Sequence, residues 1–86
     1  MMSVQIIGIG DVKTKLLRKN VDEALKSYRG DFTISNITEI NLIKFFSITS
    51  TPALSIDGEI VSQGDVPTVE DIIEFFKVSS LNQKTK

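Results

Sequence analysis

The amino-acid sequence predicts an α/β domain in which a four-stranded mixed sheet has helices on both faces. Three observations support this class. Strand-like β-branched segments alternate with segments of helical periodicity, an Asp-Gly pair separates two strand-like segments, and a regular apolar stripe lies near the C-terminal end. The 86 residues, 41% hydrophobic and 24% charged, have ordinary globular composition and suit one domain. The predicted order of elements is β-α-β-α-β-β-α.

The first half of the chain has the pattern of a βαβ unit. Residues 3–8 favour a strand, and Asp11 stands where a helix N-cap is expected. A helix is predicted over 12–28, ending before Gly30, because apolar residues recur on one face at Leu17, Val21, Leu25 and Tyr28. Residues 32–37 alternate apolar and polar side chains as a second strand does. Two strands joined through a helix are expected to be parallel, with a right-handed crossover.

The next segment predicts a short helix and then a hairpin. Thr38 can cap a helix that carries Ile40, Ile43 and Phe46 on one face. Residues 53–56 and 59–63 form strand-like segments on either side of Asp57-Gly58. This pair suits a type I′ turn, in which both central residues need positive φ, so the two strands should be antiparallel.

The last predicted element is a helix that Thr68 caps. Its apolar stripe follows the i, i+3, i+4, i+7 spacing at Val69, Ile72, Ile73 and Phe76. We expect the helix to end at Val78, because residues 79–86 are mostly polar and aperiodic and favour a frayed tail. The predicted folded domain is therefore 1–78.

Composition excludes several classes of function. The net charge of −1 provides no nucleic-acid footprint, and no segment approaches the roughly 20 apolar residues of a membrane span. The N-terminus lacks the pattern of a secretory signal, so we expect a cytoplasmic protein. The absence of cysteine removes thiolate chemistry, and the absence of histidine removes the commonest general base and metal ligand. We therefore expect no catalytic residue, metal or cofactor, and no nucleic-acid or membrane partner.

Several short motifs stand in a familiar order. They are Gly8-Ile-Gly10, the helix 17–25, Thr51-Pro-Ala-Leu54 and Ile56-Asp-Gly-Glu59. Over about residues 3–78 the chain resembles the thioredoxin fold, and in particular the small thioredoxin/glutaredoxin-like redox-active disulfide proteins of archaea and bacteria. The resemblance implies a cis Thr51–Pro52 bond. It also implies that the backbone before this proline faces an extended peptide or glutathione.

The chain departs from this family at the redox motif. The Cys-x-x-Cys of the family falls on Asp11-Val12-Lys13-Thr14, so both sulfur positions are lost and thiol–disulfide exchange is excluded. We interpret Asp11 as a helix cap rather than a catalytic base, because a carboxylate at a helix N-terminus is a weak base. Thr14 is interpreted as structural, with a hydroxyl that could bond a backbone carbonyl one turn back.

Three functions remain open. The first is a non-catalytic module that binds a protein or peptide in a groove formed by Asp11, Val12, Lys13, Thr14, Ser50, Thr51 and Pro52. The second is a binding protein or an enzyme of non-thiol type, whose glutathione or other small anion is held by backbone N–H groups at the first helix with Lys13 or Lys15. The third is a homodimer that forms through an exposed sheet edge.

Overall fold

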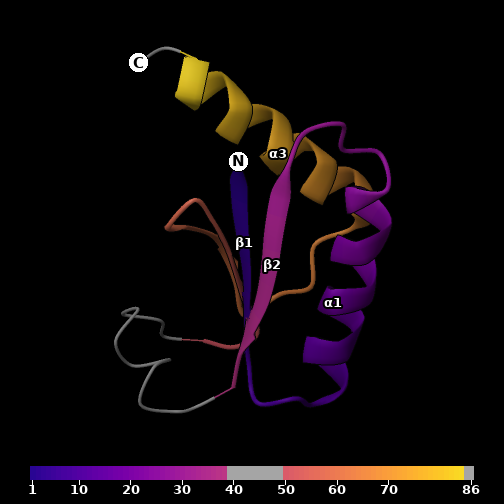
Figure 1. Cartoon of the computed structure of the whole chain (residues 1–86). Helices are drawn as coiled ribbons and strands as arrows, with labels where there is room; N and C mark the ends of the chain where they lie inside the picture. The colour runs from indigo at the N-terminus through magenta and orange to yellow at the C-terminus, as the bar shows by residue number, and fades with distance from the viewer. Residues whose placement is uncertain (39–49, 85–86) are drawn as a thin grey trace.

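Four strands form one mixed sheet in the order β2-β1-β3-β4 (Figure 1). The computed structural model describes residues 1–38 and 50–84. Its elements are β1 (Met2–Ile7), α1 (Val12–Leu25), β2 (Phe32–Ile37), β3 (Ala53–Ile56), β4 (Glu59–Gln63) and α3 (Val69–Lys84). The helix predicted after Thr38 lies outside the described residues.

Strand pairing confirms the predicted mixed sheet. β1 and β2 are parallel, with Met2 opposite Phe32 and Ile7 opposite Ile37. β3 is antiparallel to both β1 and β4. A register shift interrupts the β3–β4 pairing between Leu54 and Ser55. The three strands after β1 have the predicted bounds, because their alternation and flanking turn residues are local signals.

The hairpin turn is closed by long-range hydrogen bonds. Asp57 and Gly58 have φ of 53° and 85°, as the predicted turn requires. The Ser3 N–H donates to Asp57 Oδ1 at 2.8 Å, and the Asp57 N–H donates to the Ser3 carbonyl at 2.7 Å. The Ser79 hydroxyl donates to Asp57 Oδ2 at 2.7 Å. One turn residue therefore joins β1, the hairpin and α3.

The main core lies on one face of the sheet. Alternate residues of β1 point to this face, where both described helices cover them. The cluster consists of Met2, Val4, Ile6, Leu17, Val21, Ala24, Leu25, Leu54, Ile56, Ile72 and Phe76. A smaller cluster consists of Ile7 and Ala53, with Ile37 and Ile60 packed against it. Ile7 follows Ile6 in β1, so the alternation of side chains along a strand places it on the opposite face of the sheet.

The first helix ends earlier than predicted. α1 stops at Leu25, and Lys26, Ser27 and Tyr28 follow in turns whose N–H groups bond carbonyls three residues back. The Tyr28 ring meets the rings of Phe32 and Phe76 edge-on, with centroids 6.2 and 5.8 Å apart. Tertiary aromatic packing thus takes Tyr28 out of the helical stripe, and Gly30 is not the helix stop.

The last helix runs further than predicted. Thr68 caps it as expected, because its hydroxyl oxygen accepts the Asp71 N–H at 3.1 Å. The backbone stays helical to Lys84, six residues past Val78, where the prediction placed its end. No glycine or proline interrupts this stretch, and the bond from Ser79 to Asp57 ties the extension to the hairpin. Across residues 1–38 and 50–84, no helix has the length and apolar character needed to cross a membrane.

Candidate functional site

The candidate site lies where β1 ends and β3 begins, at the lower end of the sheet in Figure 1. Ile7 at the end of β1 pairs with Ala53 at the start of β3. The loop from Gly8 to Asp11 and the Thr51–Pro52 pair therefore lie at the same end of the sheet. The Gly64 N–H donates to the Pro52 carbonyl at 2.9 Å, which places the end of β4 there as well. The antiparallel register thus brings together residues about 40 positions apart in the chain.

Asp11 is the N-cap of α1, as predicted. Its Oδ1 accepts the Thr14 N–H at 3.0 Å and the Thr14 hydroxyl at 2.6 Å. The hydroxyl bond, followed by the backbone bond, lowers the pKa of the Asp11 carboxyl below its usual value. Asp11 is exposed, so it presents a carboxylate to solvent at neutral pH.

Thr14 bonds a different partner from the one predicted. We expected its hydroxyl to bond a backbone carbonyl one turn back, but it donates to the Asp11 carboxylate. A charged acceptor forms the shorter and stronger bond, which explains the choice. The two positions that correspond to the family's cysteines are therefore joined to each other by a hydrogen bond.

Gly8 supports this arrangement and was not singled out by sequence reasoning as a packing residue. Thr14 is 9% exposed and lies directly against Gly8. A Cβ on Gly8 would collide with the Thr14 Oγ1 and lie 2.9 Å from its Cγ2. Only a residue without a side chain leaves room for the start of α1 here.

Thr51 and Pro52 form the other half of the site. The peptide bond between them is cis. Pro52 is buried, Thr51 is half-buried and Ser50 is exposed. Among the described residues, no hydrogen bond reaches the backbone N–H or C=O of Thr51. A backbone donor and acceptor are thus available at the same end of the sheet as the Asp11–Thr14 pair.

Exposed apolar side chains lie close to Asp11 in the chain. Ile9 is 60% exposed and Val12 is 81% exposed, while Leu16 follows Val12 one turn later at 46%. Val12 was a predicted site residue, whereas Ile9 and Leu16 were not. The signal for Leu16 was an apolar residue off the buried stripe of the first helix, and the signal for Ile9 was an apolar residue between two loop glycines. We call Ile9, Asp11, Val12, Thr51 and Pro52 together the Thr51 site.

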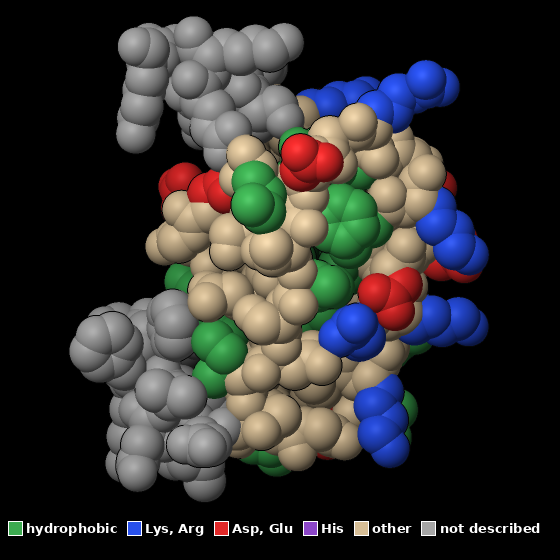
Figure 2. All heavy atoms as spheres, in the orientation of Figure 1, with side chains coloured by type: hydrophobic (Ala, Val, Ile, Leu, Met, Phe, Trp, Pro, Cys, Tyr) green, Lys and Arg blue, Asp and Glu red, His purple; other side chains and the backbone are tan. Residues whose placement is uncertain are grey.

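The basic side chains of α1 lie on a separate, solvated face. Figure 2 shows Lys and Arg side chains gathered on the side of the molecule that α1 occupies. Arg18 pairs with Asp22 and Lys26 with Glu23, each at 3.0 Å. These short-range pairs on an exposed helix are typical of a solvated surface. Lys13, which the prediction placed in the site, is exposed at the start of the helix.

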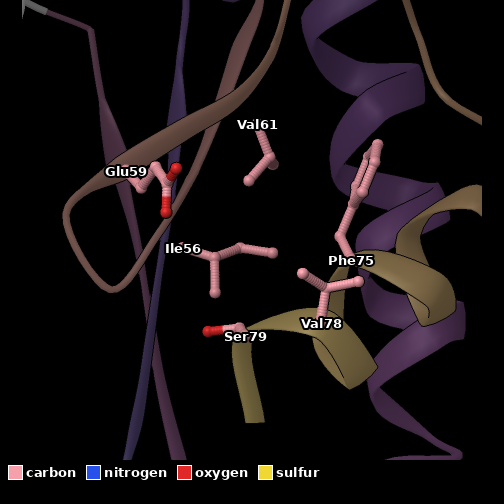
Figure 3. A pocket seen from close by; sticks show the side chains of 6 residues that line it. All are labelled: Ile56, Glu59, Val61, Phe75, Val78 and Ser79. Carbon is pink, nitrogen blue, oxygen red and sulfur yellow. The ribbon is translucent and has the colours of Figure 1, made fainter. Parts of the chain in front are cut away.

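A cavity of about 120 Å³ lies elsewhere, between the β3–β4 hairpin and α3 (Figure 3). Its walls come from Ile56, Glu59, Val61, Phe75, Val78 and Ser79. The volume is below the roughly 300 Å³ at which small-molecule pockets begin. In the described part of the chain, no three side chains of metal-ligating type come together.

Comparisons with known proteins agree with this fold. A family model described as a thioredoxin domain matches residues 2–77. The chain is 36% identical to a thioredoxin of Methanothermobacter thermautotrophicus over 72 residues, which are 84% of this chain and 94% of that protein. It is 32% identical to a thioredoxin of Methanocaldococcus jannaschii over 77 residues, covering 90% of this chain and 88% of that protein. The chain belongs to the thioredoxin domain family.

Proposed function

We propose that this domain is a non-catalytic module that binds an extended segment of a protein partner at the Thr51 site. It carries Asp11 and Thr14 where the redox motif of the family has cysteines, and the chain has no cysteine elsewhere. Thiol–disulfide exchange needs a thiolate, so the retained scaffold can contribute binding without this chemistry.

One observation carries the proposal. In the described part of the chain, the half-buried Thr51 has a backbone N–H and C=O that form no hydrogen bond. A backbone N–H or C=O that is shielded from water and has no hydrogen-bond partner destabilises the protein. An extended peptide that lies beside Thr51 supplies one acceptor and one donor, in the way that peptides add to sheet edges.

The surroundings indicate which partner chemistry suits the site. Ile9 and Val12 offer exposed apolar surface for an aliphatic or aromatic side chain. Both bonds from Thr14 end on Oδ1 of Asp11, and no described residue bonds Oδ2. A lysine, arginine or hydroxyl side chain of the partner could donate to this oxygen. The favoured segment therefore combines an apolar residue with a basic or hydroxyl residue.

A small anion such as glutathione is the weaker candidate for the same place. The α1 N-terminus would attract an anion, but the exposed Asp11 carboxylate already caps it. The lowered pKa keeps this carboxylate ionised at neutral pH, so it repels a second negative charge.

Selection of random linear peptides on the immobilised wild-type domain tests the proposal. Selected peptides are titrated into the domain, with amide shifts from NMR and affinity from calorimetry. We expect shifts at 9–14 and at Thr51. Thr51→Trp fills the space beside the free backbone groups and should weaken binding by about tenfold or more.

Ser27→Trp is the matched control, because it places the same side chain on an exposed turn beyond the far end of α1. It should leave the affinity unchanged. Equal affinity for wild type and Thr51→Trp, or shifts confined to another surface, contradicts the proposal.

A further inference from the structure

We propose that a second copy of this chain pairs with β2, so that two sheets join edge to edge through antiparallel β2 strands. This interface uses a different part of the molecule from the Thr51 site and goes beyond the binding function proposed above. β2 is an outer strand of the sheet, and within the described residues no strand lies beyond it.

The backbone phase of β2 follows from two hydrogen bonds. The Met2 N–H donates to the Asp31 carbonyl and the Gly8 N–H donates to the Ile37 carbonyl, each at 2.9 Å. In a parallel pair, alternate residues of a strand bond the neighbouring strand. Odd-numbered residues of β2 therefore face β1 with their backbone groups. Phe32, Ile34 and Asn36 direct their N–H and C=O groups toward the open edge.

The side chains of β2 offer no protection against such pairing. Residues 32–38 contain no charged residue and no proline, and Phe32 is 39% exposed. Charges, bulges and prolines are the usual devices that keep an edge strand from pairing. The other outer strand, β4, has two of them, since it begins at Glu59 and its pairing with β3 shifts register at Leu54/Ser55.

Two-fold symmetry limits the register of the pairing. A two-fold axis at Ile34 places Ile34 opposite its own copy and Phe32 opposite Asn36 of the other copy. The outward N–H and C=O groups of these three residues then pair with those of the other copy. Thr33 then lies opposite Ser35 of the other copy. Both side chains are exposed, and cross-strand hydroxyl pairs of this kind stabilise sheets. Uncharged hydroxyls meet no like charge, so the surface is complementary to itself.

Sedimentation equilibrium of three double variants tests the interface and its register. Wild type should reach twice the 9.5 kDa mass of one chain at concentrations up to about 1 mM. Thr33→Lys with Ser35→Lys places like charges opposite each other and should give monomers, as should Thr33→Glu with Ser35→Glu. An equimolar mixture of these two should give heterodimers.

Thr33→Lys with Ser35→Glu is the matched control. It introduces as many charges at the same positions, but the register places opposite charges face to face, so this variant should remain dimeric. A wild type that is monomeric throughout, or a double-lysine variant that still dimerises, overturns the interface. Dimeric wild type with a monomeric mixed-charge variant overturns the register. Folding of each variant is checked by circular dichroism, and loss of peptide binding at the Thr51 site would not alter these masses.

Discussion

Two aspartates stand at turns at opposite ends of the sheet, and they stabilise the fold in different ways. Asp11 bonds only within its own turn, through the backbone and hydroxyl of Thr14. Asp57 bonds Ser3 in β1 and Ser79 in α3, which are 54 and 22 positions away. The first is a local cap and the second connects three elements.

This difference indicates which of the two residues can be substituted without loss of the fold. A local cap contributes to one helix end, so another capping residue can replace it. A turn residue that also holds a strand and a helix is constrained by all of them. Asp11, which corresponds to a cysteine of the family's redox motif, is thus the aspartate that is easier to substitute. This agrees with a fold that is retained although the redox motif is lost.

The largest effect should come from Asp57→Ala. This change removes two acceptors and leaves alanine at a φ of 53°, so we expect a loss of about 3 kcal/mol in the free energy of unfolding. Asp57→Asn keeps an acceptor and tolerates this φ, and should lose about 1 kcal/mol. Urea denaturation measures both. Equal losses for the two variants would contradict a role for the turn conformation.

A smaller loss of about 2 kcal/mol is expected for Gly8→Ala, because the new Cβ overlaps the Thr14 side chain at the start of α1. The cost should fall when Thr14→Ala removes the overlapping atoms. A double-mutant cycle measured by urea denaturation tests this coupling. Additive losses would show that Gly8 is constrained by something other than Thr14. The contacts around Asp11 would then extend beyond its own turn, unlike the local cap described above.

The smallest effect should come from Asp11→Asn, and it should depend on pH. The folded-state pKa of Asp11 is lowered, so its charge stabilises the fold above the unfolded value of 3.8. This contribution is lost as the pH falls through the folded pKa. Urea denaturation from pH 7 to about pH 3 should show that wild type is more stable than the variant at neutral pH and that this advantage shrinks as the pH falls below the unfolded value. A difference that grows in acid contradicts the cap.

Much of the fold was predictable because its signals are local. The strands at 32–37, 53–56 and 59–63 and the Asp57-Gly58 turn follow from alternation and turn chemistry, and they have the predicted bounds. The caps at Asp11 and Thr68 follow from residue type and position. The predicted helix after Thr38 lies outside the described residues, so the helix on the second face of the sheet stays a prediction.

The candidate site was predictable only in part. Asp11 and Thr51–Pro52 were predicted as site residues through the family resemblance, and the strand register places them at one end of the sheet. The exposed Ile9 and Leu16 and the contact between Gly8 and Thr14 were missed. Exposure and close approach depend on neighbours that sequence spacing does not specify.

The sequence by itself determined the class of fold, the hairpin and the absence of thiol chemistry, because periodicity, turn preference and composition act within a few residues. Only the tertiary structure decided where α1 and α3 end, which aspartate holds distant elements together and which strands lie at the two sides of the sheet. The rings around Tyr28 and the bond from Ser79 to Asp57 involve residues far apart in the chain. Such contacts exist only after the sheet has assembled, so no local pattern reports them.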